Sequence, residues 1–251
     1  MNKTLGIIIL ILVVLGGVYL LTSNPSSAPV TSDNTNQNTG ARGRVVFSVT
    51  DAAANMSAIS EINMKVSSVA VHSATSGWMT VSTTPKTYSL LELNAESKSE
   101  LLADADIKAG TYDQVRLMVD SVTIKTTAGA TKTAKLPSGE LKINTNLVVN
   151  ADETASLNFD FLADKSLHIT GNGSYIFAPV VKTETKSDAN VSVDANSVVT
   201  VTGGRLDDTK TIGMDIDGSV KLNFQIDAKK KLNLDSNGVI KIEGTVSGLL
   251  N

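Results

Sequence analysis

From about residue 43 onward, apolar and polar residues alternate in short runs, which is the pattern of strands buried on one face. Within residues 112–120, Val115, Leu117 and Val119 fall on one face and polar residues separate them. Gly, Pro and Asn-Gly pairs divide the runs and predict turns. About eight such strands in roughly 140 residues are typical of an antiparallel β-sandwich and not of an α/β unit.

Local departures from the alternation predict particular features. In "INMKVSSVAVH" the phase changes at Ser67-Ser68, which predicts a bulge or a bend. The stretch "YSLLELNAESKSELLADA" predicts the end of a strand and then a single short helix near Ser97 to Ala103. Turns are expected at Ser76-Gly77 and Ala109-Gly110, and Asn172-Gly173 suits a two-residue hairpin with positive φ.

The chain contains one internal sequence repeat. "LNFDFLADKSLHITGNGSYIF" at 157–177 and "LNFQIDAKKKLNLDSNGVIKI" at 222–242 are identical at 8 of 21 positions, 65 residues apart. Each copy reads as a strand, a polar turn and an Asn-Gly hairpin, which together form a β-meander. We therefore expect a sandwich domain at 43–183 and a small β-rich module at 190–251 that docks on it or on a neighbouring molecule.

The N-terminal residues are uniformly apolar instead of alternating. Leu5–Leu21 has seventeen uncharged residues, about 25 Å as a helix, and Lys3 precedes it. This predicts a transmembrane anchor or uncleaved signal at 1–22, with the rest of the chain extracytoplasmic at the cell surface. A cleaved signal peptide is the alternative. Residues 23–42, rich in Ser, Thr, Asn and Pro, predict a disordered tether.

Composition removes several classes of function. The net charge of −3 gives no basic surface for nucleic acid. The absence of cysteine excludes disulfides, thiolate zinc sites and a lipid-anchoring cysteine. The sequence contains no nucleophile elbow, phosphate-binding loop or dinucleotide fingerprint, so we expect no enzyme.

A set of motifs carries a family resemblance. "GRVVFSVTDA" at Gly43–Ala52, "AGTYDQVRLMVD", "LPSG", "LNFDF" and "KSLHITGNGSYIFAPVVK" occur in the order and spacing of the prokaryotic family called domain of unknown function 4382, over about residues 43–182. The resemblance implies a prealbumin-like β-sandwich on exported or membrane-attached proteins. It implies no catalytic residue, and the chain lacks the leader cysteine that many members carry.

Candidate sites for ions and modifications are few. The two histidines, His72 and His168, stand at strand positions that we expect to be solvated. Calcium is the candidate ion, because acidic loops bind it without His or Cys. The same loops also read as turns. The candidate calcium ligands are Asp207, Asp208, Asp215 and Asp217, and the Asn-x-Ser sequons are Asn55, Asn172 and Asn190.

The leading hypothesis is a non-catalytic, membrane-anchored extracytoplasmic β-sandwich that acts as a binding or structural module, with an envelope glycan or a protein as partner. One alternative is a filament or envelope-lattice subunit that assembles by strand addition. A second is a hydrolase of envelope polymers that uses Asp160 with another carboxylate. The alternation of "LNFDF" favours a solvated strand position for Asp160.

Overall fold

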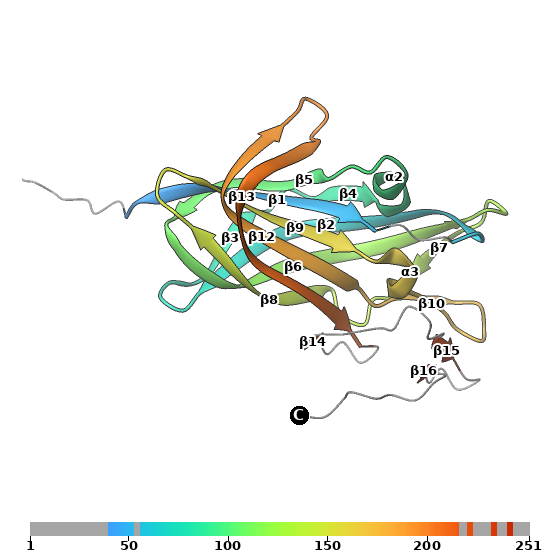
Figure 1. The fold of residues 1–251 in the computed structure, drawn as a ribbon. Coiled ribbons are helices and arrows are strands. Elements are labelled where there is room, and N and C mark those ends of the chain that lie inside the picture. The colour runs from blue at the N-terminus through green and yellow to red at the C-terminus, as the bar shows by residue number, and fades with distance from the viewer. Residues whose placement is uncertain (1–39, 53–55, 216–219, 223–231, 235–239, 243–251) are drawn as a thin grey trace, which may run out of the picture. The chain divides into compact units, whose positions relative to one another are not determined.

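The computed structural model describes residues 40–52, 56–215, 220–222, 232–234 and 240–242 (Figure 1). All of the described residues belong to one compact unit of the chain, residues 40–251. The predicted anchor and nearly all of the predicted tether lie outside the described residues. Within the described part of the chain, no helix combines the length and the apolar character needed to cross a bilayer.

The described chain is mostly β, and most of its strands belong to two sheets, here called sheet A and sheet B. Sheet A has the order β14-β13-β12-β9-β1-β5, and sheet B has β3-β2-β6-β7, with β4 also on β2 and β8 also on β6. The strands of sheet A are β1 (Arg42–Asp51), β5 (Glu100–Lys108), β9 (Thr154–Phe161), β12 (Val180–Val193), β13 (Val199–Met214) and β14 (Val220–Leu222). Those of sheet B are β2 (Ile59–Ser73), β3 (Gly77–Ser82), β4 (Lys86–Ser89), β6 (Gly110–Thr126), β7 (Thr131–Ala134) and β8 (Glu140–Val149).

The smaller elements of the described residues are two short helices and two hairpins. The helices are α2 (Leu90–Ala95) and α3 (Ala163–Ser166), and the hairpins pair β10 (Leu167–Ile169) with β11 (Tyr175–Phe177) and β15 (Leu232–Leu234) with β16 (Ile240–Ile242).

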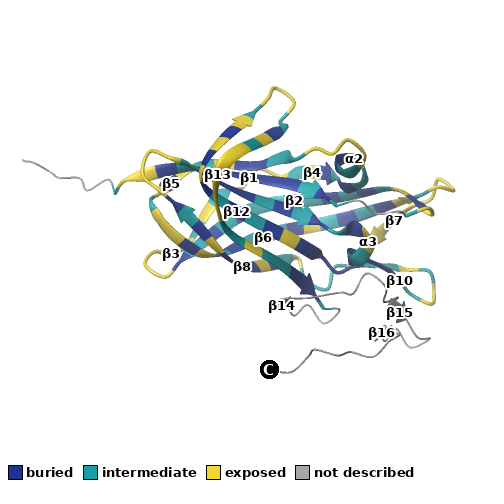
Figure 2. Cartoon of the chain, viewed as in Figure 1, coloured by how far each residue is buried: buried dark blue, intermediate teal, exposed yellow. Residues whose placement is uncertain are grey.

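The inner faces of the two sheets share one apolar core. The predicted stripe Val115, Leu117 and Val119 of β6 lies in it, together with Phe47 of β1 and Phe159 of β9. Buried and exposed residues therefore alternate along the strands (Figure 2). This confirms the predicted mostly β fold built from more than one sheet.

β12 and β13 continue sheet A beyond the end of the core. β12 runs without a break through residues 183–190, where the sequence predicted a domain boundary, and it pairs with both β9 and β13. A register shift after Thr185 bends the ribbon. The part beyond it, residues 186–206, is called the arm and rises at the top of Figure 1. The division into domains 43–183 and 190–251 stays a prediction.

The arm covers part of the outer face of sheet A. Val46 points away from the main core and forms a second apolar cluster with Ala189, Val191 and Val199 of the arm. Two backbone hydrogen bonds attach the end of the arm next to β5, from Leu101 N to the Ser197 carbonyl and from Val199 N to the Ser99 carbonyl. The arm therefore buries a sheet face that would otherwise meet water.

The predicted short helix near Ser97 to Ala103 is wrong. The helix is α2, seven residues earlier, because Leu90 and Leu93 at i and i+3 both turn into the core. Ser97 has a φ of +52°, which ends any helix there, and β5 starts at Glu100. The sequence reasoning also missed α3.

Other local predictions are confirmed. The pairing of β2 with β6 shifts register between Val66 and Ser68, so the bulge lies at the predicted serines. Gly77 and Gly173 have φ values of +68° and +76°. The loop at Asn172 is longer than the predicted two residues, because Thr170 and Ser174 close it with a backbone hydrogen bond.

The internal repeat is visible in the backbone. β15 and β16 stand 65 residues after β10 and β11, and their register is the same, with Leu232 opposite Ile242 as Leu167 is opposite Phe177. The two copies of the repeated sequence therefore encode the same hairpin. The predicted β-meander is wrong for the first copy, because α3 follows β9, and β10 and β11 form a two-stranded sheet separate from sheet A. The two copies differ in the strand that precedes the hairpin: β9 is central in sheet A, whereas β14 pairs with the last residues of β13.

Candidate functional site

The outer face of sheet B is the broad polar surface of the described chain. Its two long central strands, β2 and β6, bring acidic side chains within contact of basic or imidazole side chains on the side away from the core. Cross-strand pairs of this kind are the unit that stabilises a sheet surface. The pairs are Glu61 with Lys125 (2.6 Å), Lys65 with Asp120 (3.4 Å) and His72 with Asp113 (2.6 Å).

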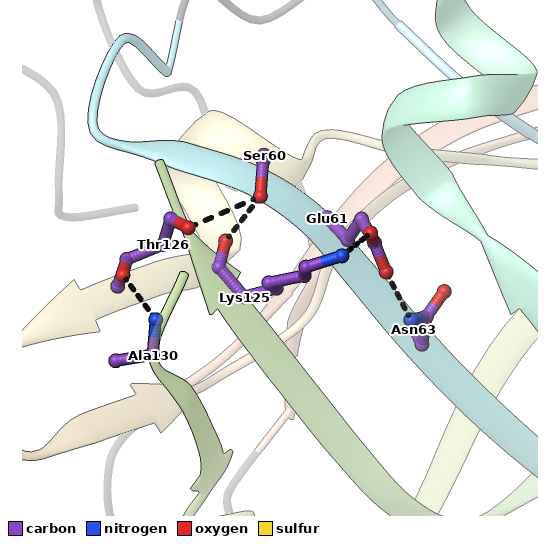
Figure 3. Close-up of polar contacts among 6 residues, drawn as sticks. All are labelled: Ser60, Glu61, Asn63, Lys125, Thr126 and Ala130. Atoms are coloured by element: carbon purple, nitrogen blue, oxygen red, sulfur yellow. Dashed lines mark hydrogen bonds and ion pairs between the residues drawn. The ribbon is translucent and has the colours of Figure 1, made fainter. Parts of the chain in front are cut away.

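At one end of this face, Glu61 is the centre of a small polar network (Figure 3). Its carboxylate accepts hydrogen bonds from Lys125 Nζ and, at 3.3 Å, from Asn63 Nδ2. These contacts lower the pKa of Glu61, with the Lys125 hydrogen bond the larger cause. Ser60 donates nearby to the carbonyls of Lys125 and Thr126. The polar groups at this end therefore largely satisfy one another.

An open hollow of about 520 Å³ lies beside this network, between β2 and α2. A second hollow, of about 530 Å³, lies beside β5 and the loop after β3. Both have mixed polar and apolar walls. The lining of the first is Ser60, Glu61, Asn63, Ser89, Leu91, Glu92 and Ala95, and that of the second includes Val81, Lys86, Leu101 and Asp104.

The other end of the face carries the only tryptophan of the chain. Trp78 stands on β3 opposite His72 of β2, and the two rings lie 5.2 Å apart and tilted by 52°. Arg116 of β6 places its guanidinium carbon 4.0 Å from the centre of the indole ring. It reaches across Ala70, which is its partner on β2 and has only a methyl group to obstruct the path. Trp78 keeps 38% of its surface exposed.

A chain of ion pairs holds Arg116 in place. Its Nε lies 3.1 Å from Glu140 Oε1 of β8, and Lys142 Nζ lies 2.9 Å from the same oxygen. The contact of Nε with Glu140 is an ion pair without hydrogen-bond alignment. The terminal nitrogens of Arg116 and Nε2 of His72 have no partner among the described residues. We call Trp78, His72, Asp113, Arg116, Glu140 and Lys142 the Trp78 site.

The candidate calcium ligands have other contacts in the structure. Asp207 pairs with Arg205 at 3.0 Å. Asp208 pairs with Lys210 at 2.9 Å and accepts a hydrogen bond of 3.0 Å from Asn146 N of β8. This bond ties sheet A to sheet B, which gives the carboxylate a structural role.

Asp215 follows the end of β13, and Asp217 lies outside the described residues. Across the part of the chain that is described, no three His, Asp or Glu side chains are grouped so that they could hold a metal ion. The calcium site stays a prediction. Asn172 and Asn190 are exposed, and Asn55 lies outside the described residues.

Asp160 was the residue considered for hydrolysis. It is half-buried, not fully solvated, and desolvation is the main cause that raises its pKa, opposed by Lys182. Its electrostatic neighbour is Asp51, which is 5% exposed and whose Oδ1 accepts a hydrogen bond from Ala163 N. Burial raises the pKa of Asp51 to about 7.

These two carboxylates are not arranged as a catalytic pair. Asp51 continues the inward series of Val45, Phe47 and Val49 in β1. Asp160 is one residue from Phe159 and Phe161 of β9, both in the core, so it points to the opposite face of the sheet. Glycoside hydrolysis needs two carboxyl groups that flank one bond, and this placement does not supply them.

The two histidines stand in different surroundings. His72 is on the outer face of sheet B and pairs with Asp113. His168 of β10 is buried, which contradicts the prediction of a solvated position, and burial lowers its pKa.

Sequence reasoning did not single out the Trp78 site. Its members come from four strands, β3, β2, β6 and β8, and no linear motif joins them. One feature of the sequence did indicate the site. The sole tryptophan follows the turn at Gly77, and Met79 and Val81 take the inward positions of the strand, so alternation puts Trp78 on the outer face.

Fold and site define a mostly β protein of two packed sheets, with a polar outer sheet surface that carries one exposed indole at its end. The family model described as "Domain of unknown function (DUF4382)" matches residues 42–179, which is more than half of the chain. The chain belongs to this family, as the motifs predicted. No curated protein and no solved structure matches it.

Proposed function

We propose that the protein is a non-catalytic binding module on the extracytoplasmic side of a membrane, anchored by residues 5–21 and presenting a prealbumin-like β-sandwich. The observation that carries the binding role is the Trp78 site. An indole with more than a third of its surface in water, surrounded by hydrogen-bonding side chains from three neighbouring strands, is the arrangement of a surface that engages a ligand.

The rigidity of this surface supports binding. The contacts of Trp78 with His72 and Arg116, and those of Arg116 with Glu140, fix side chains that would otherwise be mobile. A ligand therefore loses less free energy to the ordering of the site than it would on a surface of free side chains.

A filament or lattice subunit has less support. Assembly by strand addition needs a regular open edge. Along β13 in the arm, Gly203 and Gly204 adopt positive φ, and the register shift falls beside the charged Asp207 and Asp208. Glycines, bulges and charges are the devices that protect edge strands from pairing. We therefore favour a binding module over a filament or lattice subunit.

The experiment is co-sedimentation of the full-length protein, kept in detergent, with insoluble cell-envelope material of the producing organism from which the lipid has been removed, so that residues 5–21 cannot bind to lipid. We expect the Trp78→Ala variant to lose at least about tenfold in affinity, the equivalent of 1.4 kcal/mol. Thr80→Ala is the matched control, because Thr80 is the next outward residue on β3 and should retain wild-type binding.

Equal binding by wild type and Trp78→Ala would remove this surface from the proposal. Failure of the wild type to sediment with any envelope fraction would remove the binding role itself.

A further inference from the structure

The Trp78 site also indicates which class of ligand it takes, on the condition that the protein is a binding module. Three properties of the site bear on this: how many apolar side chains it offers, its balance of charge, and the hydrogen-bonding groups that remain free. Each narrows the class of ligand.

The apolar part of the site is a single ring. Among the described residues the large apolar side chains that are exposed are Trp78, Ile169 and Leu206, and they come from β3, β10 and β13. A protein interface of ordinary size has an apolar centre formed by several side chains. An isolated indole within polar surroundings instead matches a ligand with one small apolar face, such as the C–H face of a pyranose ring.

The charge of the site is balanced. Arg116 and Lys142 carry two positive charges, and Glu140 and Asp113 carry two negative charges, so the charges of these four residues sum to zero. The rest of the outer face repeats this balance, since Glu61 is paired with Lys125 and Lys65 with Asp120. A surface without a net field gives an acidic polymer no electrostatic advantage.

Free donors and acceptors remain in the site despite the ion pairs. Arg116 uses Nε toward Glu140, so its two terminal nitrogens stay available beside the ring, and His72 uses only Nδ1 toward Asp113. Charged groups held in position make stronger hydrogen bonds to hydroxyls than neutral groups do. Vicinal hydroxyls on a sugar ring can accept from Arg116 and donate to Asp113 or to Oε2 of Glu140, since Oε1 of Glu140 is buried against Arg116 and Lys142.

We propose that the Trp78 site binds a neutral polysaccharide, with one pyranose ring stacked on the exposed part of the Trp78 indole and its hydroxyls hydrogen-bonded to Arg116, Glu140 and Asp113. Arg116 covers part of the indole in this arrangement and also serves as a donor at the edge of the sugar.

The first test uses the sole tryptophan as its own probe. The full-length protein is titrated with soluble neutral polysaccharides (dextran, a mannan, a xylan) and acidic ones (polygalacturonate, hyaluronate) while Trp78 fluorescence is recorded. Each titration is run at about 0.01 M and about 1 M NaCl, which shortens the Debye length from about 30 Å to about 3 Å. We expect a neutral polymer to shift the emission, with an affinity that changes by less than about twofold between the two salts.

Variants are compared by affinity electrophoresis in gels that contain the neutral polymer, because this readout does not need the indole. Trp78→Ala should lose retardation by at least about tenfold, and Arg116→Ala by a smaller factor. Each variant is compared with its own mobility in a gel without polymer, because the substitutions of Arg116 and Lys125 change the net charge. Lys125→Ala is the matched control on the same sheet face, outside the Trp78 site, and the polymer should retard it as much as it retards the wild type.

The outcomes separate this inference from the proposed function. Binding of the acidic polymers only, abolished by salt, would overturn the neutral class and leave the binding role intact. Binding to envelope material but to no polysaccharide in either class would likewise overturn it and direct the search to protein partners. No binding in either experiment would overturn both proposals.

Discussion

The outer face of sheet A is partly covered by the chain itself, whereas the outer face of sheet B is exposed to solvent. On sheet A the chain covers the face with its own arm, and Val46, which points outward, is 0% exposed. On sheet B the outer face meets water: ion pairs lie along β2 and β6, and Trp78 is exposed at one end. A face that a chain covers with itself contributes to stability, whereas a face kept polar and open is available to a partner. We therefore expect stability to depend mainly on sheet A and binding on sheet B.

The largest effect on stability is expected at Asp51, on the inner side of sheet A. Its pKa is raised from an ordinary 3.8 to about 7, with burial as the first cause and the charges of Asp160 and Asp164 adding to it. Between these pH values the folded protein holds a proton that the unfolded chain has released, so the free energy of unfolding falls as pH rises. Above pH 7 the loss from this group reaches about 4 kcal/mol.

Asp51→Asn keeps an oxygen to accept from Ala163 N and removes the buried charge. The free energy of unfolding is measured by urea denaturation at a series of pH values. In the wild type it should decline between about pH 4 and pH 7, and in the variant most of this decline should be absent, so the variant should be the more stable protein at pH 8. Burial lowers the pKa of His168, so the contribution of His168 makes the free energy of unfolding rise with pH below the usual pKa of histidine. This contribution is the same in the wild type and in Asp51→Asn.

The control for Asp51 is Asp120 on the open face of sheet B. A hydrogen bond from Ser67 and the charge of Lys65 lower the pKa of Asp120. Its stabilisation is therefore present at neutral pH and lost as pH falls. Asp120→Asn should destabilise slightly near neutral pH, with a sign opposite to that of Asp51→Asn. Two variants with the same sign would refute the contrast between the sheets.

The second effect compares two glycines, one in the arm and one beside the Trp78 site. Gly204 has a φ of +80°, and a Cβ there would lie 2.9 Å from the Cβ of Ala189 and 3.0 Å from the Ser187 carbonyl oxygen. Gly77 has a φ of +68° and open space around it. Gly204→Ala should cost about 2 to 3 kcal/mol and Gly77→Ala about 1 kcal/mol, measured as free energies of unfolding in urea.

The extra cost at Gly204 comes from the packing of the two strands of the arm. If both alanine variants were equally stable, the close contacts with Ala189 and Ser187 would not constrain the protein, and the arm would not be a packed element.

The third effect tests directly whether the arm buries the outer face of sheet A at Val46. Val46→Ala removes two buried methyl groups from the cluster with Ala189, Val191 and Val199, and should destabilise by about 2 kcal/mol. Thr123→Ala changes the outer face of sheet B by a similar volume and should stay within about 0.5 kcal/mol of wild type. A Val46→Ala protein as stable as the Thr123→Ala protein would show that the arm leaves Val46 effectively in water.

The same contrast explains what the sequence could predict. Most strands, the bulge at Ser67-Ser68 and the repeated hairpin follow from local rules of alternation and turn chemistry, and they are present in the structure. The run "RVVFSV" also indicates that both faces of its strand are buried. A strand buried on one face alternates apolar and polar residues, whereas Val45 and Val46 are adjacent apolar residues that point to opposite faces. Both of its faces are covered, one by sheet B and one by the arm.

The candidate site could not be found in this way. Trp78 and Arg116 are 38 residues apart and meet only because β3, β2 and β6 are neighbours and Ala70 leaves a path between them. The burial of Asp51 also depends on packing, because the residue ends a strand at a position where an acid is usually exposed. The short helix was misplaced because the pair Leu101-Leu102 resembles an apolar helix face, but it belongs to β5.

The smallest effect concerns the open face itself. Replacing Glu61 by Gln removes one member of the network in Figure 3 and leaves Lys125 in solvent, where water satisfies its charge. The change in stability should be close to the error of a urea titration at high salt and slightly larger at low salt. Binding to the neutral polymer should not change, because the residue lies outside the Trp78 site. A clear loss of binding in Glu61→Gln would extend the ligand surface along β2 toward the hollow beside α2, and the recognition of a single pyranose ring at Trp78 would have to be replaced by recognition of a longer segment of polymer.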